Sequence, residues 1–198
     1  MSTSIFLFLD NPYCAQTSYL SIFVSYIKSQ KMPGPYSFSY VGESANLLPN
    51  LTLNENIFMD FSPNSLTNDK ENQFHEFLTL KQNIHIKSLY DHLQEKNILA
   101  SLAHDEMKKL TTLIKVLINA GQYIFLDKAD KDLSDKMRIL FKDALNIHLK
   151  SKQISTLIYT ENKTFWLPQI THIVSRNKDF QFHTESIILE STKKKIAA

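Results

Sequence analysis

The first residues with chemical potential lie in the turn Asp10-Asn-Pro-Tyr-Cys-Ala-Gln-Thr-Ser18, between an apolar segment (residues 5–9) and a helix-like segment. Loops that wrap phosphate groups occupy such a place and present inward-pointing backbone N–H groups. They use glycine to reach positive φ and to let the backbone approach the ligand. The turn has none of the chain's three glycines, and Pro12 removes one donor. The layout predicts a nucleotide-binding type of fold whose phosphate loop lacks its usual residues.

A carboxylate with metal-binding potential, Asp127, ends the apolar run Tyr123–Leu126. It could ligate Mg²⁺ or only cap the next turn, and we favour the cap. Lys128 is expected to form a surface ion pair with Asp127, Asp130 or Asp132.

The other reactive side chains give weaker signals. The seven histidines show no zinc-binding spacing, so we predict no metal site. His148 lies on an apolar helix face and is expected in the core or an interface. Cys14 precedes a helix, which would favour its thiolate, but no base partner is evident, so a nucleophile there is a minor hypothesis.

Composition limits the classes of function. A length of 198 residues, 43% of them hydrophobic, fits one domain with a substantial core. A net charge of +2 is too small to indicate nucleic-acid binding. The single cysteine suggests a reducing compartment. Polar residues interrupt the apolar N-terminal segment, so we expect neither a signal peptide nor a spanning helix, and a cytoplasmic location.

The elements that must position these residues alternate along the chain. Helices are expected between the strands, including a helix opened by Thr52 and Glu55, a helix over residues 104–120 that stops at Gly121, and a polar helical insertion over residues 60–104. A hairpin is expected near the C-terminus, over residues 170–174 and 180–182. Alternating buried strands and helices predict an α/β fold with parallel strands, and the strands are expected at residues 5–9, 36–41, 123–126 and 155–159.

The order of these segments resembles the ATPase domain of ABC transporters over nearly the whole chain. The segment Leu47-Leu-Pro-Asn-Leu-Thr-Leu-Asn-Glu-Asn-Ile57 is similar to the family's stretch after the Q-loop. Residues 117–127 with Leu133 resemble the helix after the signature motif, the Walker B strand and the D-loop. Ser155–Thr160 resembles the strand before the switch histidine.

The resemblance implies a P-loop NTPase-like core with a mostly parallel sheet and a helical insertion. It implies a single domain over residues 1–198, with residues 1–59 and 105–198 as the α/β core and 60–104 as the helical subdomain. Strands 5–9 and 123–126 are then expected to be neighbours in one sheet. The chain begins a few residues before its first strand, so we expect the family's N-terminal β-subdomain, which stacks on adenine, to be truncated.

Several positions that match the family's motifs carry other residues. The Walker A lysine position has Gln16, although the following hydroxyl is retained as Thr17. The signature motif falls within residues 102–106, which contain no glycine. The remaining matches are Glu43 for the Q-loop glutamine, Asp127 for the Walker B aspartate, Lys128 for the catalytic glutamate and Glu161 for the switch histidine. Because phosphoryl transfer is catalysed by positioning and by neutralising charge, these residues predict no ATPase activity and no cofactor.

The expected function is therefore that of a non-catalytic relative that acts through protein contacts, as an accessory or regulatory subunit. The expected partner is a membrane permease subunit, an intact ATPase subunit or a second copy, and the location is then peripheral at the inner face of a membrane. The alternative is an ATP-binding subunit whose degenerate site a partner ATPase completes. Phe74 is a further candidate anchor beside the expected partner-binding residues, which are Glu43, Leu47, Leu48, Asn56, Phe58 and Phe61.

Overall fold

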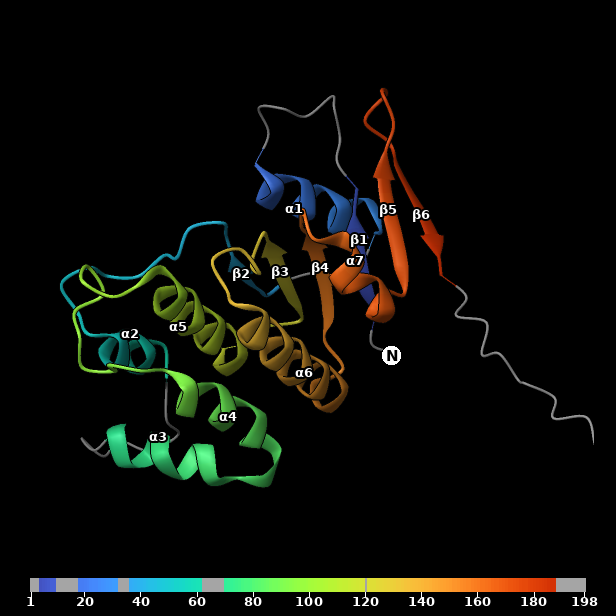
Figure 1. Cartoon of the computed structure of the whole chain (residues 1–198). Coiled ribbons are helices and arrows are strands. Elements are labelled where there is room, and N and C mark those ends of the chain that lie inside the picture. The colour runs from blue at the N-terminus through green and yellow to red at the C-terminus, as the bar shows by residue number, and fades with distance from the viewer. Residues whose placement is uncertain (1–3, 10–17, 32–35, 62–69, 120, 188–198) are drawn as a thin grey trace, which may run out of the picture.

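The computed structural model describes residues 4–9, 18–31, 36–61, 70–119 and 121–187, and these residues contain one six-stranded sheet (Figure 1). The strand order is β2-β3-β4-β1-β5-β6. Neighbouring strands are parallel except β5 and β6, which form an antiparallel pair. The strands are β1 (Ile5–Phe8), β2 (Phe38–Val41), β3 (Tyr123–Asp127), β4 (Ser155–Tyr159), β5 (His172–Arg176) and β6 (Phe182–Ser186).

This sheet confirms the predicted parallel α/β architecture and the C-terminal hairpin. The expectation that β1 and β3 are neighbours was wrong, because β4 lies between them and pairs with both. Consecutive parallel strands joined by a helical crossover usually lie side by side. The strand that follows β3 along the chain therefore takes the place next to it, and β1 is one position further away.

Helices lie on both faces of the sheet (Figure 1). The helix α1 packs on one face, where Phe23 and Tyr26 contact aromatic side chains of β1 and β3. The opposite face is covered by α5 and α6, whose apolar side chains form the larger core with β3 and β4. The helical elements are α1 (Tyr19–Ser29), α2 (Leu53–Asp60), α3 (Lys70–Thr79), η1 (Lys81–Asn83), α4 (Ile84–His92), α5 (Asp105–Ile118), α6 (Asp135–Lys152), α7 (Lys163–Trp166) and η2 (Leu167–Gln169).

The start of α2 shows how local sequence sets an element. The Thr52 hydroxyl accepts the Glu55 backbone N–H at 3.1 Å, and the Glu55 carboxylate accepts the Thr52 backbone N–H at 2.7 Å. This reciprocal capping box is the one that the sequence predicted. The elements α3, η1 and α4 follow within the range expected to be helical, and α4 packs against α5 and α6.

Candidate functional site

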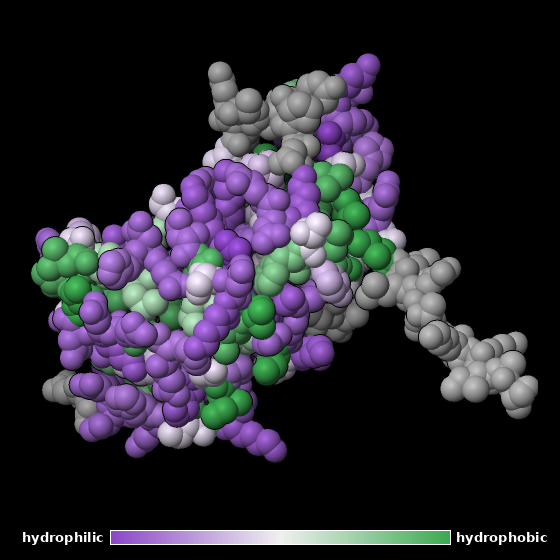
Figure 2. Space-filling model, viewed as in Figure 1, coloured by the Kyte–Doolittle hydropathy of each residue, from purple (hydrophilic) through white to green (hydrophobic). Residues whose placement is uncertain are grey.

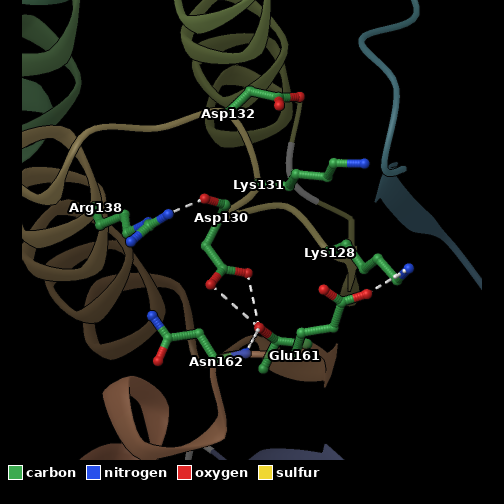
Figure 3. A pocket seen from close by; sticks show the side chains of 8 residues that line it. Lys128, Asp130, Lys131, Asp132, Arg138, Glu161 and Asn162 are labelled. Carbon is green, nitrogen blue, oxygen red and sulfur yellow. Dashed lines mark hydrogen bonds and ion pairs between the residues drawn. The ribbon is translucent and has the colours of Figure 1, made fainter.

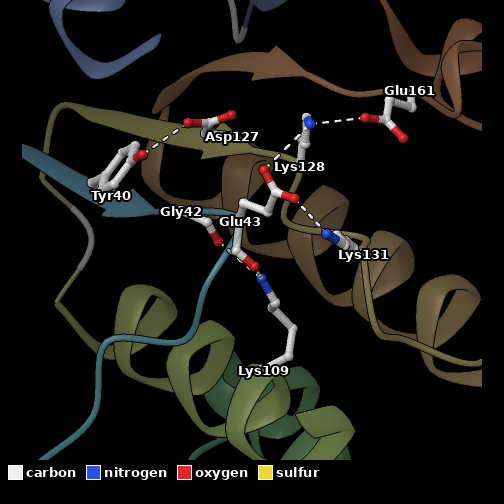
Figure 4. Close-up of polar contacts among 8 residues, drawn as sticks. All are labelled: Tyr40, Gly42, Glu43, Lys109, Asp127, Lys128, Lys131 and Glu161. Carbon is white, nitrogen blue, oxygen red and sulfur yellow. Dashed lines mark hydrogen bonds and ion pairs between the residues drawn. The ribbon is translucent and has the colours of Figure 1, made fainter. Parts of the chain in front are cut away.

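The candidate site lies at the carboxyl ends of β2, β3 and β4, which meet at one edge of the sheet (Figure 4). The parallel register pairs Val41 with Leu126, and Asp127 with Tyr159. The segments that leave these strands therefore begin side by side, although they are far apart in sequence. Their charged residues come within bonding distance of one another.

Lys128 occupies the centre of this group. Its ammonium group lies 2.8 Å from Glu161 Oε1 and 3.2 Å from Glu43 Oε2. The Glu161 contact contributes most to raising the pKa of Lys128 above its ordinary value. The sequence-based pairing of Lys128 with Asp127, Asp130 or Asp132 was wrong. Its partners come from the ends of β2 and β4, which only the assembled sheet brings within reach.

Glu43 bridges two lysines. Its second carboxylate oxygen accepts a hydrogen bond from Lys131, in the loop between β3 and α6. The pKa of Glu43 is lowered, mainly by Lys131 and then by Lys128. Glu43 is therefore an anion held between two cations.

Lys109 of α5 adds a buried cation, which contacts the segment that follows β2. Its side chain is only 1% exposed, and its ammonium group donates to the backbone carbonyls of Gly42 at 2.9 Å and Glu43 at 2.6 Å. Burial lowers the pKa of Lys109, while Asp132 and Glu43 act in the opposite direction. Lys109 was not among the residues predicted from the sequence. The available signal was its helical spacing from Leu113 and Val116, which are both buried.

Asp127 accepts a hydrogen bond from the Tyr40 hydroxyl at 2.9 Å, which ties the end of β3 to β2. Burial is the largest cause of a raised Asp127 pKa, and the Tyr40 hydrogen bond opposes it. Burial and the contact with Asp127 raise the pKa of Tyr40 as well. In this structure the carboxylate thus holds a neighbouring strand. Among the described residues, no group of three His, Cys, Asp or Glu side chains could hold a metal ion.

A polar pocket of about 360 Å³ opens beside Lys128 and Glu161 (Figure 3). On its wall, the buried Asp130 carboxylate accepts the Thr160 hydroxyl at 2.8 Å, and the Asp130 backbone carbonyl accepts Arg138 Nε at 3.2 Å. Three cations and three anions line the pocket together with two uncharged polar side chains. Opposite charges in equal number make it a poor receptor for a polyanion such as a triphosphate.

Gln16 and Thr17 lie outside the described residues, as does Cys14. The description resumes at Ser18, whose hydroxyl accepts the Ser21 backbone N–H and begins α1. The next side chain, Tyr19, stacks on Tyr159 with ring centroids 3.4 Å apart. An aromatic contact therefore joins the start of α1 to the carboxyl end of β4.

His148 is buried, and its partner is another histidine. His148 Nδ1 and His85 Nε2 lie 3.0 Å apart, which links α6 to α4. Burial is the largest cause that lowers the pKa of both residues, that of His148 to about 4. The expected core or interface histidine is a core residue that holds the helical insertion against α6.

Two of the predicted partner-binding residues are interior, which corrects the expectation that they face a partner. Asn56 has no exposed surface: its side chain accepts Leu48 N at 2.8 Å and donates to the Leu48 and Thr52 carbonyls. Phe61 is 7% exposed and packs on Phe74, which is fully buried. The helices α3 and α4 cover these aromatic side chains, which the apolar pattern alone did not reveal.

Other residues of the predicted surface reach solvent. Leu48 is 48% exposed, Glu43 and Leu47 are partly exposed, and Phe58 is partly buried against Phe74. Leu99 and Leu102 are also exposed, and backbone hydrogen bonds join residues 49–53 to 98–101. Figure 2 shows apolar surface at this end of the molecule, over the loops that lead into α2 and α5. We call Leu48, Leu99 and Leu102 the leucine patch.

No helix within the described ranges combines the length and the apolar character needed to cross a bilayer.

Comparisons with known proteins identify the fold. No protein-family model matches the sequence. No curated protein matches it either. The ATP-binding cassette MJ0796, solved as a dimer in a post-hydrolysis state with ADP and Pi, has a TM-score of 0.66 and 12% identity, over 94% of this chain and 86% of that one.

Two further solved structures are similar. One is a putative metal-chelate type ABC transporter in an inward-facing conformation, with a TM-score of 0.60, 12% identity and coverage of 93% of this chain and 72% of that one. The other is an RNase-L inhibitor, with a TM-score of 0.66 and 7% identity, over 91% of this chain and 34% of that one. The chain therefore has the fold of ABC ATPase domains, a P-loop NTPase-like fold with a mostly parallel sheet.

Proposed function

We propose that this chain is a non-catalytic protein with an ABC ATPase fold that acts through contacts with another protein. One observation carries the proposal: the Lys128 ammonium group, directly after Asp127, is held between the carboxylates of Glu43 and Glu161. In the resembling family, these three positions orient water and sense the γ-phosphate. Here they form an ion-pair network among themselves.

The charges explain why such a site is unsuited to ATP turnover. A phosphoryl-transfer site concentrates cations where negative charge develops and keeps a carboxylate or amide to orient the attacking water. Here two carboxylates occupy that region, and the residue after Asp127 is a cation. The loss of one donor aimed at the developing charge costs about 3 kcal/mol of transition-state stabilisation, so these changes in combination abolish useful catalysis. The charges of the described residues at these strand ends do not fit a bound Mg-triphosphate.

We place the partner contact on the leucine patch and on the segment from Glu43 to Met59. The exposed leucines offer apolar anchors at the end of the molecule where the loops lead into α2 and α5 (Figure 2). In the resembling family, this region receives a segment of the membrane subunit. The partner would be a permease subunit, an intact ATPase subunit or a second copy, with the protein peripheral to the inner face of a membrane. The helical subdomain would span residues 60–104 of a single domain.

The first test is the effect of Mg-ATP on thermal unfolding, read together with phosphate release. A ligand at one hundred times its Kd stabilises the folded state by about 2.7 kcal/mol. We expect no rise in Tm at millimolar Mg-ATP and no phosphate release above background. A competent ABC ATPase domain serves as the positive control.

Phosphate release by the purified chain alone overturns the proposal. A rise in Tm without phosphate release contradicts it in favour of an ATP-binding subunit that a partner completes.

A further inference from the structure

We infer that Lys109, Lys128 and Lys131 act as a latch that fixes the segment after β2 in one conformation without a nucleotide. The inference deepens the proposed function, because this segment leads into the proposed partner-binding surface. The latch itself rests only on the contacts of the described residues.

The first component acts on the backbone. Lys109 projects from α5 and donates to two consecutive carbonyls, of Gly42 and Glu43 (Figure 4). Because Lys109 is 1% exposed, water does not replace these hydrogen bonds. A buried ammonium group left without acceptors is costly. The energetic penalty of releasing it therefore opposes movement of residues 42 and 43 away from α5.

The second component acts on the side chain of Glu43. Lys128 and Lys131 both lie in the segment that leaves β3, and each contacts a different oxygen of the carboxylate. Lys128 has a left-handed backbone conformation with φ of 50°, and its N–H donates to the Tyr159 carbonyl at 2.8 Å. The Lys128 side chain also pairs with Glu161. The segment after β2 is thereby tied to the segments that leave β3 and β4.

The far end of the loop is fixed as well. Asn56 of α2 makes hydrogen bonds to both the N–H and the carbonyl of Leu48. The loop from Glu43 to Leu48 is therefore anchored at both ends before any partner arrives. Ordering a loop in advance lowers the entropic cost of binding. We expect the leucine patch to be preorganised, and its conformation to depend on ionic strength but not on ATP.

Hydrogen exchange measured by mass spectrometry on the full chain tests the latch. In Lys128→Met and in Glu43→Gln, we expect the amides of residues 42–48 to exchange about threefold to tenfold faster than in the wild type, because ion pairs to Glu43 are lost or weakened. In Lys109→Met we expect a larger increase, of about tenfold or more. The matched control is Lys136→Met, at an exposed lysine of α6 outside the latch.

Two further measurements sharpen the test. Raising the salt concentration to about 1 M, where the screening length falls to ~3 Å, should speed exchange of residues 42–48 by a larger factor in the wild type than in Lys128→Met, which keeps only the Lys131–Glu43 pair. Adding Mg-ATP should leave the exchange of this segment unchanged. The double variant Lys128→Glu/Glu161→Lys keeps opposite charges at positions 128 and 161 but removes the cation of position 128 that contacts Glu43. Residues 42–48 of this variant should therefore exchange faster than in the wild type.

The latch is refuted if residues 42–48 exchange at the wild-type rate in both Lys128→Met and Glu43→Gln. It is also refuted if Mg-ATP slows exchange of this segment in the wild type. Lys109→Met is not essential to this judgement, so failure of that variant to fold leaves the test intact. Unchanged exchange in the variants refutes the latch and leaves the proposed function standing, whereas ATP hydrolysis with faster exchange in the variants refutes the function alone.

Discussion

At the scale of single residues, the charged groups at the strand ends are satisfied by partners from other elements. Both carboxylate oxygens of Glu43 have a partner, because Lys128 contacts one and Lys131 contacts the other. Asp127 is held by Tyr40 and Asp130 by Thr160. A polar group that is partly buried and bonded in this way contributes to stability mainly by avoiding the cost of an unpaired charge.

The His85–His148 pair predicts a specific dependence of stability on pH. The pKa of His148 is lowered to about 4 in the folded state, mainly by burial, whereas an unfolded histidine titrates near 6.5. The unfolded state therefore binds more protons, so the stabilisation is complete above about pH 6.5 and is lost as pH falls toward 4. We expect this site to remove about 2–3 kcal/mol of stability over that range.

Urea unfolding of the wild type and His148→Gln at several pH values between 7 and 4 measures this effect. The variant should show a smaller loss of stability on acidification than the wild type, even if its stability at pH 7 is lower. Replacement of the exposed His183 by Gln is the control and should leave the slope unchanged. Parallel pH dependences in the wild type and His148→Gln would contradict the buried neutral pair.

At the scale of elements, Gly121 has a different role from the one that its sequence position suggested. We expected it to stop the helix, but α5 ends at Ile118 with Asn119 as its C-cap, and Gly121 does not have positive φ. A Cβ atom on Gly121 would lie 2.7 Å from the Ser37 carbonyl carbon and 2.9 Å from Phe38 N. Glycine is needed here because the backbone entering β3 passes against the start of β2.

Replacing Gly121 by Ala should therefore destabilise the protein by about 1–3 kcal/mol, because β2 must move to make room for the methyl group. Chemical unfolding measures the change, and hydrogen exchange should show the largest increase in β2. The matched control is Gly42→Ala, whose Cβ would have side-chain atoms of Tyr40 as its nearest neighbours, at 3.1 Å or more, and no backbone atom as close as at Gly121. Equal losses in the two variants would contradict the close backbone approach as the cause.

Elements were predicted well where the signal was local. The capping box at Thr52 and Glu55 and the apolar spacing of α5 and α6 depend on residues within one or two turns of each other. The place of β4 between β3 and β1 was missed, because strand order depends on how crossovers pack, which no local pattern records.

At the scale of the whole molecule, burial separates the leucine patch from a side chain that was expected to bind a partner. Leu102 is 69% exposed, whereas Phe61 is 7% exposed within the aromatic cluster of the helical insertion. Leu102→Ser should change the free energy of unfolding by no more than about 0.5 kcal/mol. Phe61→Ala should lower it by about 3 kcal/mol or more, because it leaves a cavity in the core.

Denaturant unfolding of these two variants separates a surface contact from a core contact. If the wild type associates with itself, sedimentation analysis should show weaker association for Leu102→Ser at unchanged stability. A large loss of stability in Leu102→Ser would contradict an exposed patch and indicate that the leucine is part of the core.

The sequence by itself determined the succession of strands and helices along the chain, because apolar periodicity and capping residues act over a few neighbours. Its resemblance to ABC ATPase domains also led to the prediction that several motif positions carry other residues, and this stays a prediction. Only the tertiary structure decided which cation meets which anion and which aromatic side chains are covered. Lys128 finds Glu43 and Glu161 because three strand ends converge, and such contacts depend on distances in space that the spacing along the chain does not contain.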